Sequence, residues 1–224
     1  MKTIATYIPA AALGTLLLIG GTNKASAVTI YSQTFTGGTG ALVGTTSTTG
    51  NGTWAGDDII NRNGALVGGW GAASLAFTPT SGLVYELTAT IDRTSGSWIG
   101  VGFLQSNDLY GWYPNNPTAL RTTGWQIWPQ ASNASALTSN NVTIRLDTTL
   151  ANWTTSMYQG GAQIGSTYTY TTNPTITRVG FVSEGSEGQV SAFQLTAIPE
   201  PSTYAMVLGG LLNLSLIRRR RVQA

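Results

Sequence analysis

The chain has 224 residues, of which only 9% are charged, and it contains neither cysteine nor histidine. The missing residue types exclude disulfide frameworks, thiol nucleophiles, cysteine zinc sites and every catalytic triad that uses histidine. The low charge and the 28 glycines favour strands and turns over amphipathic helices.

The basic residues lie mainly at the two ends, so the formal net charge of +2 does not indicate a basic surface. Lys2 and Lys24 fall in the leader and Arg218 to Arg221 in the tail. Between residues 28 and 198, five arginines stand against eight acidic residues, which gives a net charge of −3. A phosphate-binding face is therefore excluded, and we expect no nucleic-acid partner.

The leader has the parts of a secretory signal peptide. Lys2 precedes an apolar stretch from about Ile8 to Ile19, and Ala25 and Ala27 form a small-x-small cleavage site. We expect signal peptidase to cut after Ala27, so that the mature chain begins at Val28. The alternative is an uncleaved membrane anchor, which needs a longer apolar run.

The region from 28 to 197 consists of short alternating runs separated by Gly, Asn, Ser and Pro, a pattern typical of antiparallel strands. In "VTIRLDTT", Val142, Ile144 and Leu146 are expected to face the core. Similar runs are "GLVYELTATID", "SWIGVGFLQ", "GWQIWP", "WTTSMYQGG", "STYTYTT", "ITRVGFVSE" and "QVSAFQLTAI". We predict an all-β fold, an antiparallel β-sandwich of the jelly-roll type. Core positions are also expected for Trp98, Trp125 and Trp153.

The order of these runs carries a resemblance. "YSQTFTGGTGALVG" opens the region, "GLVYELTATIDRTSGSWIGVGF" and "VTIRLDTTLANWTTSMYQGG" follow, and "ITRVGFVSEGSEGQVSAFQLTAI" closes it. This order resembles the concanavalin A-like or laminin-G-like jelly roll over most of residues 30–197. The resemblance implies a fold more than a function.

Paired carboxylates decide whether such a jelly roll can be a glycosidase, because hydrolysis needs two of them about 5.5 Å apart or wider. Glycosidases of this class carry an E-x-D-x-x-E strand, and this chain has none. Glu184 and Glu187 flank a predicted turn, while Asp57 and Asp58 are adjacent and would point to opposite faces of a strand. We therefore expect no enzyme and no catalytic residue; a glycoside hydrolase or lyase of the jelly-roll class is the alternative.

Aromatic residues gather in the polar segment "NDLYGWYPNNPTALRTTGWQIWPQ". Sugar rings stack on aromatic faces while nearby amide and carboxylate groups bind their hydroxyls. Trp112, Tyr113 and Trp128 are therefore candidate glycan-binding residues, and packing at the core or rim is the alternative reading of them. Asp108 could join a calcium site, but a lone carboxylate predicts no metal, and we expect no cofactor.

The threonines of "STYTYTT" suggest a third function, since flat threonine rows can order water as in ice-binding proteins. Only one short row occurs, without stacked repeats. Thermal hysteresis of the purified protein would test this alternative.

The tail has three parts in series: Pro199-Glu200-Pro201, an uncharged segment of 16 residues from 202 to 217, and Arg218 to Arg221. As a helix the segment would span about 24 Å, short of a hydrocarbon core of about 30 Å, although arginines can snorkel to the interface. The arginine cluster predicts a stop-transfer signal with its charges in the cytoplasm. The two prolines predict an extended tripeptide that joins neither helix nor sheet.

This series resembles the PEP-CTERM sorting signal over roughly the last 26 residues. The resemblance implies that an exosortase-type membrane protease recognises the motif of Pro199, Glu200 and Pro201, with the cluster of Arg218, Arg219, Arg220 and Arg221 behind it. The protein would then be passed to the cell surface or the exopolysaccharide matrix of a bacterium with an outer membrane. The alternative is a permanent C-terminal membrane anchor.

Three segments follow from these patterns: a signal peptide over 1–27, a β-sandwich over 28–197 and a sorting segment over 198–224. We expect an exported protein that is held briefly in the inner membrane by its C-terminal helix. Its expected role at the surface or in the matrix is structural or glycan-binding, with extracellular polysaccharide as the candidate partner.

Protein recovered from its native host is expected to begin at Val28 and to end between Pro199 and Pro201, because both cleavage sites flank the domain. Intact-mass measurement on each cell fraction checks this. Replacing Glu200 and Pro201 by alanine should leave the tail attached. Wild-type chains that keep Arg218 to Arg221 in the inner membrane would instead indicate a permanent anchor.

Overall fold

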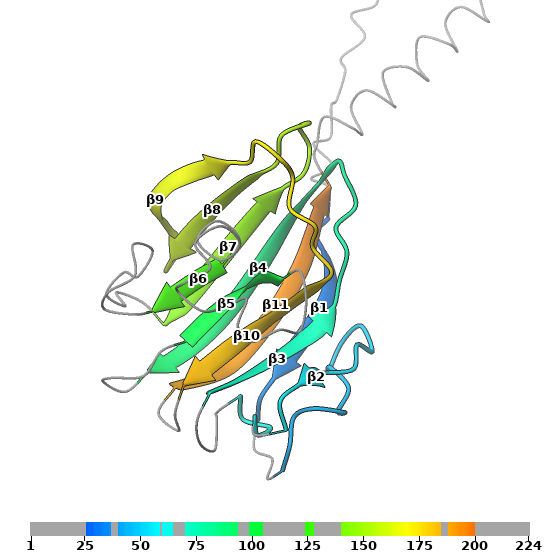
Figure 1. The fold of residues 1–224 in the computed structure, drawn as a ribbon, viewed down its shortest axis with the longest axis vertical. Coiled ribbons are helices and arrows are strands. Elements are labelled where there is room, and N and C mark those ends of the chain that lie inside the picture. Colours follow the sequence, from blue (N-terminus) through cyan, green and yellow to red (C-terminus); the bar gives the residue numbers. More distant parts are fainter. Residues whose placement is uncertain are drawn as a thin grey trace, which may run out of the picture.

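The structure is a computed structural model that describes residues 26–36, 40–58, 60–64, 70–93, 99–104, 124–127, 140–184 and 188–199. For residues 70, 92–93, 124–127, 183–184 and 188 it describes the backbone alone. All the strands in these ranges belong to two antiparallel sheets that face each other (Figure 1). The predicted all-β, antiparallel sandwich is confirmed.

The larger sheet has six strands in the order β1-β11-β4-β7-β8-β9. Its strands are β1 (Val28–Thr34), β4 (Leu83–Arg93), β7 (Asn141–Asp147), β8 (Thr154–Gln159), β9 (Ala162–Thr169) and β11 (Gly188–Pro199). The smaller sheet has five strands in the order β2-β3-β10-β5-β6. Its strands are β2 (Ala55–Gly56), β3 (Trp70–Ala76), β5 (Ile99–Leu104), β6 (Gly124–Ile127) and β10 (Arg178–Glu184).

Strand β3 is absent from the sequence prediction. Its sequence, WGAASLA, is rich in small residues and shows no alternation. The reason is that neighbouring residues are both buried: Ala72 is 4% exposed, Ala73 0% and Leu75 0%. A strand covered on both faces loses the polar-apolar rhythm by which strands are recognised.

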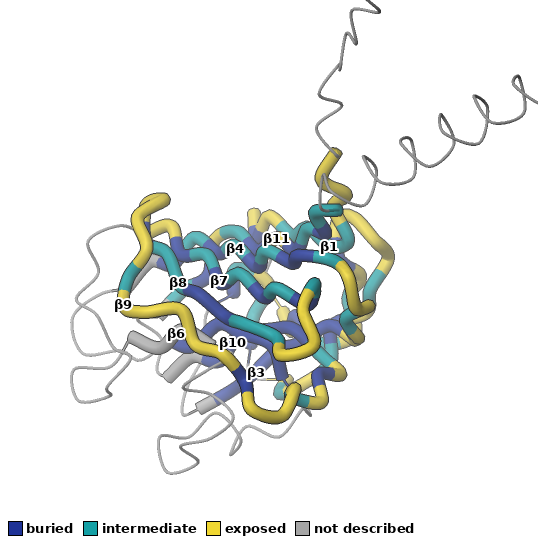
Figure 2. The backbone as a smooth tube through the Cα atoms, turned by 90° about the horizontal axis from the view of Figure 1, so that it is seen from above, coloured by how far each residue is buried: buried dark blue, intermediate teal, exposed yellow. Residues whose placement is uncertain are grey.

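The core between the sheets contains the predicted inward residues. Val142, Ile144 and Leu146 are 1%, 0% and 0% exposed, as their alternation in β7 predicts. Figure 2 shows such buried positions concentrated between the layers, whereas β9 at the edge is largely exposed. Trp153 packs against this core from a partly buried position. Trp98 lies outside the described residues, as does the side chain of Trp125.

Four aromatic rings join the two sheets at one end of the core. Phe35 follows β1, Trp54 comes from the loop between β1 and β2, Phe181 lies in β10 and Phe193 in β11. The ring of Trp54 lies 5.8, 5.7 and 5.3 Å from those of Phe35, Phe181 and Phe193. Edge-to-face and tilted packing of this kind adds about 0.5–1.5 kcal/mol per pair to the burial of the rings. We call these four residues the aromatic cluster.

The first and last strands begin and end together. Val28 of β1 is paired with Ala197 of β11, and β11 continues to Pro199, which is paired with Leu83. The expectation that the proline-containing tripeptide joins no sheet is therefore wrong for Pro199, and the strand runs two residues past the expected boundary at 197. Since β1 starts opposite Ala197, the end of β11 has a partner on one side only, which is where a strand tolerates proline.

Within the described ranges, no helix has the length and apolarity needed to cross a membrane. The apolar segment 202–217, for which a membrane helix is expected, lies outside the described residues, as do Glu200 and Pro201.

Truncation of the central ring of the aromatic cluster should cost much stability. Trp54→Ala is expected to lower the free energy of unfolding by about 3–5 kcal/mol, because it opens a cavity between both sheets, and Trp54→Phe should cost less. Urea unfolding followed by circular dichroism measures both. Leu150→Ala is the matched control, because Leu150 is 69% exposed and its loss should change stability by less than about 0.5 kcal/mol. A cost below about 1 kcal/mol for Trp54→Ala would contradict this role.

Candidate ligand-binding groove

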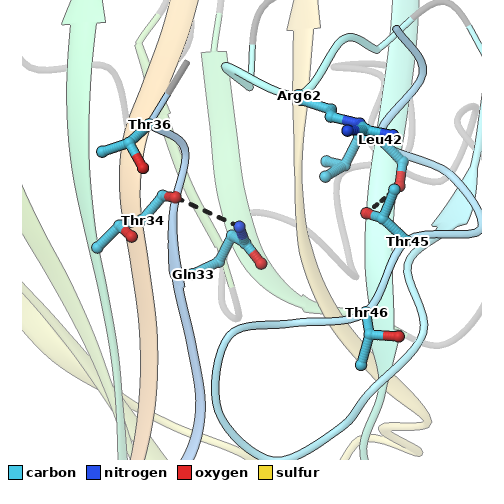
Figure 3. Close-up of a pocket in the computed structure, with 7 residues that line it drawn as sticks. All are labelled: Gln33, Thr34, Thr36, Leu42, Thr45, Thr46 and Arg62. Carbon is cyan, nitrogen blue, oxygen red and sulfur yellow. Dashed lines mark hydrogen bonds between the residues drawn. The ribbon is translucent and has the colours of Figure 1, made fainter. Parts of the chain in front are cut away.

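A polar groove of about 370 Å³ lies where the chain leaves β1. Figure 3 shows residues from the end of β1 on one side of it, and on the other side residues from the loop between β1 and β2 together with Arg62, which follows β2. Its lining consists of Gln33, Thr34, Thr36, Leu42, Thr45, Thr46 and Arg62. None of these seven side chains is aromatic or acidic, so the groove offers hydroxyl, amide and guanidinium groups.

The first wall follows from the alternation of side chains at the end of β1. Phe35 is buried in the aromatic cluster, whereas Thr34 and Thr36 on either side of it are exposed. The amide of Thr36 donates to the carbonyl of Thr34 at 2.8 Å, which makes a tight turn. Burial of the ring therefore presents two hydroxyls together at the surface.

The second wall is a short antiparallel ladder between the loop that follows β1 and the segment that follows β2. Leu42 donates from its amide to the Ile60 carbonyl at 2.7 Å, and Arg62 donates from its amide to the Gly40 carbonyl at 3.0 Å. Leu42 and Ile60 are buried at 1% and 0% exposure, which fixes the ladder against the core. Arg62 is exposed and lines the groove.

The loop continues as a hairpin that leads to Trp54. The amide of Gly44 donates to the Trp54 carbonyl at 2.8 Å, and the Trp54 amide donates to the Thr45 carbonyl at 2.9 Å. The Thr45 hydroxyl donates to the Leu42 carbonyl at 2.6 Å. The groove wall is thus tied by main-chain hydrogen bonds to a tryptophan that is 1% exposed.

Two glycines let the loop lie against the strands. Gly50 has φ +87°, and a Cβ there would overlap the carbonyl oxygen of Ile30 in β1. Gly64 has φ +72°, and a Cβ there would overlap the carbonyl oxygen of Val190 in β11. Any other residue at either position would combine a left-handed backbone with a clash, so the loop would have to move off the sheet.

Gln33 connects the two walls. Its Oε1 accepts hydrogen bonds from the Thr48 amide at 3.2 Å and from the Trp54 Nε1 at 3.5 Å, and its Nε2 donates to the Thr34 carbonyl at 3.3 Å. Gln33 is paired with Phe193 in the register of β1 and β11, so it lies at the border of the core. Its amide is committed to the scaffold, so the groups that remain for a ligand are elsewhere.

Those groups are three hydroxyls and one cation. The hydroxyls of Thr34, Thr36 and Thr46 and the guanidinium of Arg62 form no hydrogen bond or ion pair with another residue in the described ranges. A hydroxyl both donates and accepts, and a guanidinium donates from a planar fork. This combination matches a ligand rich in hydroxyls.

None of the described residues that line the groove is a residue predicted from sequence to form a site. Trp112, Tyr113, Trp128 and Asp108 lie outside the described residues, and so do Ala25 and Arg218 to Arg221. Ala27 is exposed just before β1. The prediction that the aromatic segment binds glycan therefore stays a prediction.

The acidic pairs are placed in part. Asp57 and Asp58 follow β2 rather than lying on a strand, and Asp57 accepts a hydrogen bond from the Ala72 amide at 2.8 Å, while Asp58 is exposed. Glu184 is the last residue of β10, and Glu187 lies outside the described residues. Among the described side chains, no group of three or more acidic residues is placed to hold a metal ion.

Sequence reasoning missed the groove because its residues, spread from 33 to 62, form no motif. The signals that exist are indirect. Asn51-Gly52, with Asn51 at φ 53°, is a hairpin signal, and the run "GALVG" over 40–44 provides one side of the wall ladder.

No protein-family model matches this chain, and no curated protein matches it in sequence. Similar solved structures include the carbohydrate recognition domain of Emp47p, at 11% identity and a TM-score of 0.41, covering 75% of this chain and 96% of that one. A legume lectin-like domain from Entamoeba histolytica has 9% identity and a TM-score of 0.37, covering 63% and 88%. A protein of unknown function with a galectin-like fold from Bacillus subtilis has 12% identity and a TM-score of 0.36, covering 77% and 98%. Likenesses this distant assign no ligand.

The scaffold role of Gln33 predicts a stability effect. Gln33→Leu should lower the free energy of unfolding by about 1–3 kcal/mol, because two donors then lose their acceptor. Gln33→Glu keeps an accepting oxygen and should cost less. Urea unfolding compares the two, and equal costs would show that the acceptor is not what Gln33 contributes.

Proposed function

We propose that this protein is exported to the surface or matrix of a bacterium and binds glycan there through the groove. The observation that carries the proposal is the set of hydroxyls of Thr34, Thr36 and Thr46 beside the Arg62 guanidinium, which have no partner among the described residues. Sugars present hydroxyls that both donate and accept, and a wall of threonines can satisfy them in either sense.

The composition of the groove sets the expected strength of binding. The described residues of the lining include no aromatic platform, so each contact with them is a hydrogen bond worth about 0.5–1.5 kcal/mol net. Three or four such contacts correspond to dissociation constants near the millimolar range. A polysaccharide offers many equivalent units, so repeated weak contacts would suffice to keep the protein in a matrix.

The position of the groove supports display away from a membrane. Val28 and Pro199 lie at one end of the sandwich, and the groove lies at the other end of β1, seven residues or about 20 Å away. In Figure 1 the end of β11 lies at the top, and the light-blue loop between β1 and β2 lies at the lower right. A chain held by its C-terminal tail would carry the groove on the far side.

Export and sorting form the second part of the proposal. The signal peptide and the sorting segment fit the fold in one respect: a chain cut before Val28 and after Pro199 keeps β1 and β11 whole. The exosortase-type protease would need Glu200 and Pro201, which follow directly after the strand. The partners on this route are signal peptidase, that protease and the inner membrane.

We propose a binding or structural role rather than catalysis. Among the described carboxylates, Asp57 is bonded to the backbone, and Glu86 and Asp147 alternate with the buried residues of β4 and β7. None of them lines the groove. A hydrolase of the jelly-roll class would have to draw its carboxylates from outside the described residues.

Removing the groove hydroxyls should abolish glycan binding. The triple variant Thr34→Val, Thr36→Val, Thr46→Val keeps the side-chain shapes and should weaken binding to polysaccharide from the native host at least about tenfold, because three hydrogen bonds are lost. Isothermal calorimetry or sedimentation with the polysaccharide measures this. The control replaces three exposed threonines away from the groove, Thr169, Thr171 and Thr172, by valine.

A separate pair of variants distinguishes the two candidate sites. Trp112→Ala with Trp128→Ala changes none of the described residues that line the groove. Binding that survives the threonine triple variant but is lost in the tryptophan pair would contradict the groove and favour the aromatic segment.

A further inference from the structure

We propose that the groove selects an acidic glycan, a polysaccharide containing uronic acid whose carboxylate pairs with Arg62. This inference rests on the proposed function and makes it more specific. It follows from the state of Arg62 compared with that of the other arginines.

The structure describes the side chains of three arginines, Arg62, Arg145 and Arg178, and of these only Arg178 forms side-chain hydrogen bonds within the described residues. Arg178 donates from Nε to the Ser74 hydroxyl at 2.8 Å and from a terminal nitrogen to the Ser74 carbonyl at 3.2 Å. Partial burial lowers the pKa of its guanidinium, but arginine remains charged at neutral pH. Arg145 stands directly opposite Glu86 in the register of β4 and β7, where opposite charges attract.

Arg62 differs from both in that its side chain lines the groove, while its backbone is held by hydrogen bonds. Its amide donates to the Gly40 carbonyl at 3.0 Å, and Arg62 lies at the centre of a turn in which the Asn63 amide donates to the Asn61 side chain at 3.2 Å. The side chain lines the groove and forms no ion pair within the described part of the chain. A fixed base with an uncompensated guanidinium is suited to binding a carboxylate through two parallel hydrogen bonds.

The surrounding groups narrow the ligand to an acidic sugar. A lone carboxylate would need only the arginine, but Thr34, Thr36 and Thr46 add three hydroxyls to the same groove. One planar anion beside several hydroxyls is the chemical pattern of a uronic acid residue.

The net charge of the domain does not favour the binding of an acidic glycan. Residues 28–198 carry a net charge of −3, so the domain as a whole repels polyanions instead of attracting them. Affinity for an acidic glycan must then come from Arg62 in the groove. Loss of this one cation should therefore remove the preference completely.

The test uses the full-length protein and three probes: oligogalacturonate, the same oligosaccharide as its methyl ester, and dextran sulfate. The wild type should bind the oligogalacturonate about tenfold more tightly than the neutral ester. Arg62→Gln should abolish this preference, so that the acid and the ester bind equally, while Arg62→Lys should keep part of it. Arg145→Gln removes a charge away from the groove lining and should change nothing. Because the Arg62 side chain holds no other described residue, circular dichroism should show an unchanged fold.

The other outcomes separate the two proposals. Equal binding of acid and ester, both lost in the threonine triple variant, would overturn the acidic inference and leave glycan binding intact. Equal, Arg62-dependent binding of dextran sulfate would show a general anion site and overturn the choice of a carboxylate. Binding of none of the probes and no binding of the host polysaccharide would overturn both proposals.

Discussion

The burial of Trp54 is the constraint on which the candidate site depends. This residue belongs to a loop, yet it is 1% exposed and packs against rings from β10 and β11 in the two facing sheets. Its backbone bonds to Gly44 and Thr45 then hold the hairpin that forms the second wall. The loop is rich in glycine and threonine and has little other apolar surface. The buried ring of Trp54 therefore provides packing that holds the loop on the sandwich.

The same packing explains how the groove can bind with so few contacts. Phe35 is buried in the aromatic cluster, which places Thr34 and Thr36 at the surface. On the opposite wall, the buried side chain of Leu42 fixes the backbone against the core. The backbone that carries these hydroxyls is thus held by packing, so a ligand would have to order only the threonine side chains.

The fold could be predicted from sequence where one face of a strand is polar, and not elsewhere. β7 alternates strictly, so Val142, Ile144 and Leu146 were assignable to the core without a structure. β3 is buried on both faces and shows no alternation, so it was missed. Pro199 can belong to β11 because β1 begins opposite Ala197, so no strand on that side needs a hydrogen bond from the missing amide of Pro199. The groove lies beyond such reasoning, because long-range contacts of Trp54 and Gln33 create it. Residue type was the basis for considering the carboxylate pairs and for proposing Trp112, Tyr113 and Trp128 as binding residues.

The two ends of strand β1 lie at different features of the molecule, the chain termini of the domain at its start and the groove at its finish. At the start of β1, Val28 and the end of β11 are paired, so whatever precedes or follows the domain is attached at that end. At the finish of β1, the chain turns into the groove. Because an antiparallel strand is stiff over its length, a tether at one end fixes the direction in which the other end faces. The net charge of −3 gives no long-range attraction for an anion, so the proposed selectivity for an acidic glycan rests on the orientation and chemistry of the groove.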